Sequence, residues 1–558
     1  MRVLDASDAH GRFAVEVLAG LGAEVERAPL SDEALSRADV VVVGRAAREW
    51  LARGGEWPRL VWVAVTPFGL AGPRAEWAGD ELIAQAAGGM VWPNGHPGAP
   101  PLRLPGDQAT RGAGLHAALG ALLGLLARRR DGRGRLVDVS LQESATAMLE
   151  HVAGEWFDHR DPAMRRGTLH WNGTFRVGRC RDGEVLLSHV GDWTALREWL
   201  IADGAARDLA DRRWDDVDER CRHAAHVFAV LDDWAARYAV DALVEQAQLR
   251  RLPFAPVWSF ERFARALGEI PTAGIMRAEA STSNPIARSL QLGAPLRGIR
   301  VVDFTWVVAG PLATRVLADF GAEVIRVERP DARPPAGSSE ANLQRGKRRL
   351  TLDLRSAPGL DELRVLLRDA DVVVDNFSRR VLPNLGFDDD ALQALNPRLV
   401  IAHLTGFPAA DARAEWAAFG PTMQAMAGLV DDMRPAGGPP AGPGFAYADT
   451  ATAWAAAVAR SAAGTSITTD SPLSSPIRRW CTGSAGRALA RIGWSATTST
   501  SSTTRAASNR PYASPFGSDQ TSTANITATM PARTIDNPNR RRTAAASCCG
   551  RRAESAAV

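Results

Sequence analysis

Residues 296–330 read LRGIRVVDFTWVVAGPLATRVLADFGAEVIRVERP, and this stretch decides the fold. Its first part, IRVVDFT at 299–305, is a run of apolar and β-branched residues, which is typical of a strand buried in a parallel sheet. Residues 309–320 have apolar side chains at helical spacing, with Pro311 in the first turn, where a helix tolerates it. AEVIRVE at 322–328 reads as a second strand. Strand, helix and strand within about 30 residues indicate a βαβ unit.

The same alternation continues downstream of this unit. Two further strands are expected at 350–354 (LTLDL) and 371–377 (DVVVDNF), with a helix at 359–369 between them, and PRLVIAHLTGF at 397–407 reads as another strand. This order predicts an α/β fold with a doubly wound, Rossmann-like parallel sheet. The Gly-x-Gly-x-x-Gly signature of dinucleotide-binding folds is absent, which argues against a nicotinamide or flavin dehydrogenase.

The N-terminal part of the chain contains a degraded copy of this stretch. The blocks GAEV, ADVVV, PRLV and RAEWA occur there and again, in the same order, in the later stretch. A spacing of roughly 300 to 340 residues is far longer than the ~20–50 residues of solenoid repeats, so the pattern predicts a domain duplicated in tandem. The segment that holds RGKRR and LTLDL is missing from the first copy.

Five segments follow from this pattern. The predicted divisions are a degenerate first large domain at 1–170, a smaller α+β domain at 171–280, a linker at 281–295, a second large domain at 296–460 and a tail at 461–558. The tail is rich in Ser and Thr and has no sustained apolar period, which favours disorder. Because regular patterning breaks inside an expected helix, we interpret the second copy as truncated by an out-of-frame sequence, with a natural disordered tail as the alternative.

Composition favours a soluble cytoplasmic protein. A formal charge of +3 over 558 residues does not suggest a nucleic-acid partner. The five cysteines form neither a metal-ligand nor a disulfide pattern, so we expect no metal and a reducing compartment. The start of the chain does not read as a signal sequence, and the longest apolar run, 113–127, is too short to span a bilayer, so no membrane association is expected.

The second copy resembles the family III coenzyme A transferases, also called the CaiB/BaiF family. The blocks that carry the resemblance are VDFTWVVAGP, GAEVIRVE, RGKRRLTLDL, DNFSRRVLPNLGF, NPRLV and GPTMQAMAGL. The first copy is similar through TPFGLAGP, DELIAQAAGGM, GDQATRGAGLHAALG and RRRDGRGRLVDVSLQES. Both together resemble the tandem-fused members of that family, and the resemblance covers nearly all of the chain before residue 461.

This resemblance implies an enzyme that moves coenzyme A from an acyl-CoA to a carboxylic acid through a covalent aspartyl-CoA thioester. No cofactor would be bound permanently, since CoA is carried by the substrates. A carboxylate is a weak nucleophile in water and needs desolvation and nearby N–H donors. The matching aspartates are Asp449 and Asp107, each before a helix of small residues. The simpler alternative for either one is a helix N-cap.

The resemblance also implies a CoA-binding set in the second copy. Its members are Val307, Val308, Ala309, Arg329, Lys347, Arg348, Asn376 and Phe377. Lys347 is the single lysine of a chain rich in arginine, which favours a functional reason for it, such as a phosphate contact. Packing in the core is the alternative for Phe377, and Arg379 and Arg380 read as a solvated face. The first copy lacks these residues and is expected to have lost CoA binding.

Two other functions stay open at this point. An α-methylacyl-CoA racemase shares the expected fold, but its histidine–aspartate pair has no counterpart here: the equivalent segments are Gly79-Asp80-Glu81 and Gly420-Pro421-Thr422. An inactive, truncated remnant is the other alternative. Family members form interlocked dimers, so we expect either a homodimer or an intrachain pseudo-dimer of the two copies.

Overall fold

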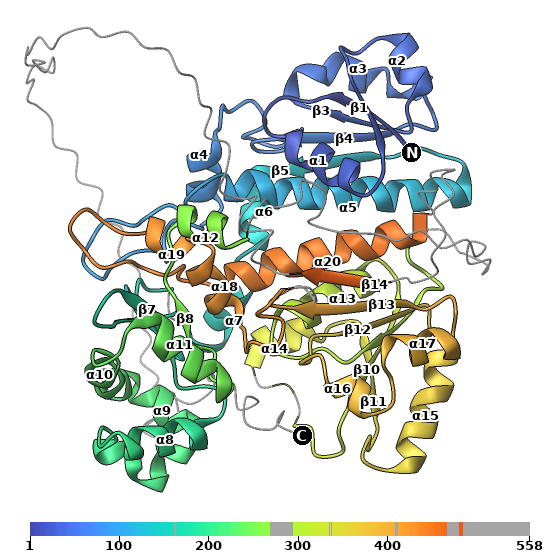
Figure 1. The fold of residues 1–558 in the computed structure, drawn as a ribbon. Helices are drawn as coiled ribbons and strands as arrows, with labels where there is room; N and C mark the ends of the chain where they lie inside the picture. The colour runs from blue at the N-terminus through green and yellow to red at the C-terminus, as the bar shows by residue number, and fades with distance from the viewer. Residues whose placement is uncertain are drawn as a thin grey trace, which may run out of the picture.

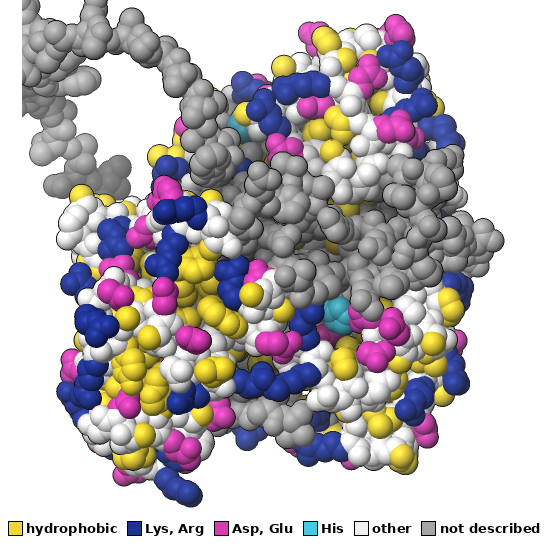
Figure 2. Space-filling view, in the orientation of Figure 1, with side chains coloured by type: hydrophobic (Ala, Val, Ile, Leu, Met, Phe, Trp, Pro, Cys, Tyr) yellow, Lys and Arg dark blue, Asp and Glu magenta, His cyan; other side chains and the backbone are white. Residues whose placement is uncertain are grey.

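The computed structural model describes residues 1–160, 163–267, 294–333, 335, 337–407, 411–465 and 479–483. Two parallel sheets lie on either side of two long central helices, and a smaller unit lies beside them (Figure 1). The predicted α/β class with parallel sheets is confirmed. Charges of both signs are interspersed over the face shown in Figure 2, which agrees with the small net charge.

The first sheet has the strand order β2-β1-β3-β4-β5, and all of its pairs are parallel. Its strands are β1 (Arg2–Ala6), β2 (Glu24–Arg27), β3 (Val40–Val43), β4 (Val61–Thr66) and β5 (Leu136–Ser140). Every residue of β3 and β4 is buried, because helices cover both faces of these central strands. The helices of this unit are α1 (Arg12–Gly20), α2 (Asp32–Arg37), α3 (Arg48–Ala52), α4 (Glu81–Ala87), α5 (Gln108–Asp131), α6 (Leu141–Ala147) and α7 (Glu150–His159).

The second sheet has the order β11-β10-β9-β12-β13-β14, again with parallel pairs throughout. Its strands are β9 (Arg300–Asp303), β10 (Glu323–Glu328), β11 (Lys347–Thr351), β12 (Val372–Asp375), β13 (Val400–Thr405) and β14 (Arg479–Gly483). Its helices are α13 (Ala309–Asp319), α14 (Gly337–Leu343), α15 (Ala357–Arg368), α16 (Val381–Asn384), α17 (Asp389–Leu395), α18 (Gly420–Met426), α19 (Leu429–Asp432) and α20 (Tyr447–Thr465). Without the edge strand β11, this order matches that of the first sheet strand for strand.

The central helices α5 and α20 join the two sheets. α1 packs on α5, α13 packs on α20, and α5 and α20 pack on each other (Figure 1). A single hydrophobic core therefore runs from Val3 in β1 to Ala459 in α20. Among the described residues, α5 is the one helix long and apolar enough to cross a membrane, but 72% of that stretch is buried inside the protein, as in the core helix of a globular fold. It is also longer than the apolar run expected from the sequence, because the basic turn of Arg128–Arg130 continues it.

The smaller unit is built on an antiparallel sheet. Its strands β6 (Phe175–Arg179), β7 (Glu184–Ser188) and β8 (Ala255–Pro256) pair in the order β6-β7-β8. The helices α8 (Trp193–Ala202), α9 (Val217–Arg222), α10 (Ala224–Ala235), α11 (Val240–Leu249) and α12 (Phe260–Leu267) accompany it. It has a core of its own, which includes Trp214, Trp234 and Phe254. Residues 268–280 of the predicted small domain, and 281–293 of the predicted linker, lie outside the described residues.

Regular structure continues past the boundary expected at residue 460. α20 runs to Thr465, and residues 479–483 form β14, which pairs in parallel with β13. The expected end of regular structure was therefore too early, because the alanine-rich helix continues and the open edge of β13 offers unpaired backbone groups. Apart from these two elements, the tail whose disorder or shifted frame we predicted lies outside the described residues.

Candidate functional site

Asp449 lies in the first turn of α20, with its carboxylate against the backbone of Gly420, the first residue of α18. A methyl group placed on Gly420 would lie 2.1 Å from Oδ2 of Asp449. Only a glycine at this position allows the carboxylate to come so close. The sequence analysis named Gly420 as part of the GPTMQAMAGL block and of a segment without histidine, and the structure shows that its missing side chain makes room for the expected nucleophile.

The surroundings of Asp449 favour its neutral form. The residue is half-buried. Burial raises the pKa of its carboxyl group to about 7, opposed in part by its own backbone N–H. At neutral pH a substantial fraction is therefore ionised, and this ionised form is poorly hydrated. A carboxylate of this kind is a better nucleophile than one in bulk water.

The expected CoA loop follows β9 and is strained. Val307 has a φ of 66°, in the left-handed region that β-branched residues avoid. Its side chain is 41% exposed, although valine is normally buried. Val308 follows as the N-cap of α13, and Ala309 begins the helix. Strain held in an exposed loop at a helix start is a common feature of ligand-binding sites.

Asn376 holds this loop in place from the end of β12. Its Nδ2 donates to the carbonyl of Trp306 at 2.8 Å, and its Oδ1 accepts from the N–H of Trp306 at 3.0 Å. Both hydrogen-bonding groups of the amide therefore support the residue next to Val307. Phe377 is half-buried and packs on Phe304, with ring centroids 6.3 Å apart. These two predicted residues lie at the loop, and their contacts position it.

Lys347 occupies a different place from the one expected for a phosphate contact. Its side chain is 1% exposed, and Nζ donates to Oδ2 of Asp303 at 3.0 Å and to the carbonyl of Pro311 at 2.8 Å. Burial lowers the pKa of this ammonium group, while the Asp303 carboxylate opposes the shift. The ammonium joins β11 to β9 and to the first turn of α13. In the structure Lys347 thus supports the loop through β9 and α13, and its expected contact with a phosphate stays a prediction.

The two predicted arginines are more accessible. Arg348 has a side chain that is 74% exposed and contacts Glu323. Arg329, just after β10, is 43% exposed and forms an ion pair with Asp331 at 3.2 Å. Of the expected basic residues, these two can reach a ligand from the surface.

Asp107 lies at the N-cap of α5 but does not cap it with its side chain. Glu81, from α4, does so instead: its carboxylate accepts from the N–H groups of Ala109 and Thr110 at 2.7 and 2.9 Å. In the first unit, therefore, a carboxylate of the protein already occupies the start of the helix. The starts of α5 and α20 are also joined, because the Tyr447 hydroxyl contacts Oε1 of Gln108.

A row of aromatic rings, which sequence reasoning missed, connects the loop to Gly420. Phe419 lies 6.2 Å from Trp306 and 5.8 Å from Phe175, measured between ring centroids. Trp306 is next to Val307, and Phe419 is next to Gly420. The expected loop and the expected nucleophile are thus brought to one place by residues that are 113 positions apart in sequence (419 minus 306). The contact between Trp306 and Phe419 could not be predicted from local sequence patterns, because the two residues are far apart in the chain.

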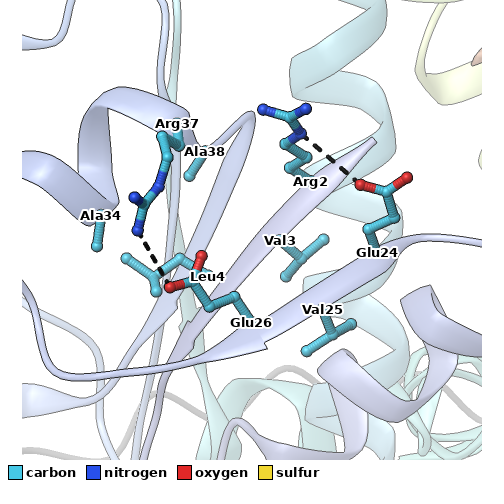
Figure 3. Close-up of a pocket in the computed structure, with 9 residues that line it drawn as sticks. All are labelled: Arg2, Val3, Leu4, Glu24, Val25, Glu26, Ala34, Arg37 and Ala38. Atoms are coloured by element: carbon cyan, nitrogen blue, oxygen red, sulfur yellow. Dashed lines mark hydrogen bonds and ion pairs between the residues drawn. The ribbon is translucent and has the colours of Figure 1, made fainter.

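The remaining features to consider are a pocket on the first sheet and groups of possible metal ligands. A pocket of about 290 Å³ opens on the first sheet between β1, β2 and α2, and none of the expected site residues lines it (Figure 3). In the part of the chain that the structure describes, no group of three or more His, Cys, Asp or Glu side chains could hold a metal ion.

A family model for CoA-transferase family III matches residues 44–287 and 296–467. The chain belongs to CoA-transferase family III. The two matched segments include both aspartates and the strained loop, and the second ends two residues beyond α20.

Curated relatives agree with this membership. The protein named "Probable CoA-transferase Rv1866" from Mycobacterium tuberculosis is 28% identical over 66% of this chain and 53% of its own length. A succinate–glutarate CoA-transferase from Agrobacterium fabrum is 39% identical over 28% of this chain and 44% of its own length. The chain thus spans about half the length of the curated relatives it matches. Among solved structures, a CaiB/BaiF family protein from Brucella suis is 19% identical, with a TM-score of 0.41 over 46% of this chain and 83% of its own.

Proposed function

We propose that this family III member transfers coenzyme A from an acyl-CoA to a carboxylic acid, with Asp449 as the nucleophile. The observation that carries the proposal is the half-buried carboxylate of Asp449, held against Gly420 with a pKa raised to about 7. It lies near the strained loop at Val307, which the family resemblance assigns to CoA. The acyl-CoA and the acid would be its partners, and CoA would be carried as substrate.

The proposed transfer has four balanced steps. An oxygen of Asp449 attacks the thioester carbonyl, the C–S bond breaks, and CoA leaves as a thiolate from a mixed anhydride. The thiolate attacks the Asp449 carbonyl and releases the donor acid as a carboxylate, which leaves an aspartyl-CoA thioester. The acceptor carboxylate then attacks that carbonyl and expels the thiolate. In the last step the thiolate takes the acceptor acyl group and frees Asp449.

The residues expected to bind CoA divide into two groups by their contacts. Val307, Val308 and Ala309 present the exposed turn and helix start to the nucleotide, with Arg329 and Arg348 at the surface for its phosphates. Lys347, Asn376 and Phe377 hold this arrangement from behind. Asp107 is kept as a second candidate nucleophile, but Glu81 already occupies the start of its helix.

Trapping the covalent intermediate tests the proposal. The full chain is incubated with a panel of acyl-CoAs that includes succinyl-CoA, hydroxylamine is added, and the modified residue is mapped by mass spectrometry. We expect a hydroxamate at Asp449 that Asp449→Asn abolishes and Asp107→Asn does not. Modification at Asp107 alone would reverse the assignment, and CoA transfer without any adduct would exclude the covalent route.

The same preparation distinguishes the alternatives. A racemase would exchange the α-hydrogen of a branched acyl-CoA with solvent in heavy water, without moving CoA to another acid. An inactive remnant would show neither exchange, nor transfer, nor an adduct. We expect transfer and no exchange, because the segment Gly420-Pro421-Thr422 supplies no histidine to act as the second catalytic group of a racemase.

We also infer that residues 1–170 and 296–460 are tandem copies that form a pseudo-dimer within one chain. Matching strand orders support this, as do the equivalent pairings of α1 with α5 and α13 with α20. We propose that the enzyme works in the cytoplasm, where its acyl-CoA substrates are made and used.

A further inference from the structure

The segment that leads into Asp449 is fastened to the first unit on several sides. The N–H of Gly444 donates to Oδ1 of Asn94 at 2.8 Å, and the N–H of Ala446 donates to Nε2 of His151 at 3.3 Å. Thr450, just after Asp449, has its hydroxyl 3.4 Å from the carbonyl of Met148. The residues on both sides of Asp449 are therefore held by the first unit: by Asn94, by Met148 at the end of α6 and by His151 in the first turn of α7.

His151 is well placed to fix this geometry. It is 7% exposed, and its ring packs on Trp171 with centroids 4.6 Å apart. Burial, the largest cause, and the nearby His170 lower its pKa to about 3, so the imidazole is neutral at ordinary pH. Because Nε2 accepts the N–H of Ala446, the ring proton lies on Nδ1.

The helix that carries His151 is itself anchored to the second unit. Glu150 accepts from Arg315 of α13 at 2.8 Å and from Asn342 of α14 at 3.0 Å. The first turn of α7 thus contacts both the helix that begins at the CoA loop and the segment that presents Asp449. Figure 1 shows α7 near the start of α20 and beside α14.

We propose that His151 is a positioning residue for Asp449: the first unit acts in the reaction by holding the nucleophile of the second. This inference rests on the proposed transfer chemistry. The neutral ring satisfies the N–H of Ala446, the residue just before α20, and so keeps the Asp449 carboxylate against Gly420. Removing the acceptor leaves that N–H buried and unpaired, which lets the segment move and water reach the carboxylate.

The test compares three full-length variants. His151→Leu removes the acceptor, and His151→Gln restores an oxygen of similar reach. His189→Leu is the matched control, since His189 is likewise a buried histidine and bonds the carbonyl of Gly173 within the small unit. We expect His151→Leu to slow adduct formation at Asp449 about tenfold, with CoA affinity within about twofold of wild type. His151→Gln should recover most of the rate, and His189→Leu should cause no selective loss.

A second measurement does not depend on turnover. A water-soluble carbodiimide and an amine label carboxyl groups, and mass spectrometry follows the rate at Asp449. We expect labelling of Asp449 to be about threefold faster in His151→Leu than in wild type or His151→Gln, because local opening exposes the carboxylate. If wild type forms no adduct, the transfer proposal fails while labelling still tests His151. Equal labelling in all variants, or equal losses in His151→Gln, His151→Leu and His189→Leu, would overturn the positioning role.

Discussion

A methyl group added at Gly420 would occupy the space of the Asp449 carboxylate. In Gly420→Ala the new carbon would lie 2.1 Å from Oδ2, so the carboxylate must move away from its present place. We expect the rate of CoA transfer to fall at least about 100-fold, since small displacements of reacting groups have effects of this size. CoA binding, measured by calorimetry, should stay close to wild type. Gly442→Ala is the control, because a methyl group there meets open space; equal activity in both variants would contradict the assignment.

Because the pKa of Asp449 is raised, we expect Asp449→Asn to stabilise the folded protein by an amount that depends on pH. Its carboxyl group titrates near 4 when unfolded and at about 7 when folded. Because the folded state binds this proton more tightly, the stability that the protonated carboxyl group contributes is fully present below the unfolded pKa. That stability is lost as pH rises through about 7. Asp449→Asn should therefore raise the free energy of unfolding at pH 8 by on the order of 1–3 kcal/mol, and change it little near pH 4. Urea titrations at both pH values check this; a gain of the same size at pH 4 would exclude the electrostatic cause.

At the scale of residues, the sequence singled out side chains but did not predict their contacts. Asp449 could be named in advance because its motif is local. Lys347 also stood out, as the one lysine, but its partner Asp303 is on a strand two places away across the sheet. A contact of that kind depends on strand order, which local patterns do not contain. The same reason hid His151, whose partner Ala446 is 295 residues away.

Lys347 links the edge strand β11 to β9 and α13 through its contacts with Asp303 and Pro311. Lys347→Ala would leave Asp303 buried without its cation, although Thr305 and Thr314 still donate to it. We expect a loss of roughly 2–4 kcal/mol in the free energy of unfolding, as for broken buried ion pairs. Arg380→Ala, at an exposed position, should change it by less than about 0.5 kcal/mol. If Lys347→Ala weakens only CoA binding and leaves denaturant unfolding unchanged, the phosphate contact first expected would be right after all.

Relieving the strain in the loop between β9 and α13 should raise the stability of the fold and weaken the binding of CoA. Val307→Gly removes the cost of a positive φ at a β-branched residue, and should stabilise the fold by on the order of 1 kcal/mol. CoA should nevertheless bind more weakly, because the loop loses its fixed shape. Thermal unfolding and CoA titration measure the two effects. A variant with lower stability and unchanged affinity would show that the strain has no role in binding.

Patterns predicted most strands of the second sheet, but β11 lies at Lys347–Thr351 and not at the expected 350–354. The strand–helix–strand unit at 299–328 is present as β9, α13 and β10, since buried parallel strands have a strong compositional signal. The end of α20 was harder, because alanine and serine support a helix without marking where it stops. β14 could not be foreseen, because it depends on the open edge of β13.

For the whole molecule, the packing of α5 on α20 predicts a monomer. These helices pair within one chain and share one hydrophobic core, so the two units already cover each other. Sedimentation equilibrium should give a mass near 59.7 kDa that does not change with protein concentration. A species of twice that mass would instead support the interlocked homodimer.

The shared core between α5 and α20 also has a consequence during synthesis. α5 leaves the ribosome early, but α20, which packs on it, is among the last of the elements that the structure describes to be made. At about 5–20 residues per second, α5 waits on the order of tens of seconds before this partner exists. The nascent first unit therefore exposes apolar surface of α5 until α20 is made. We expect chaperones that bind exposed apolar surface to bind the first unit during this time. The order of synthesis, as well as the final contacts, shapes how this chain reaches its fold.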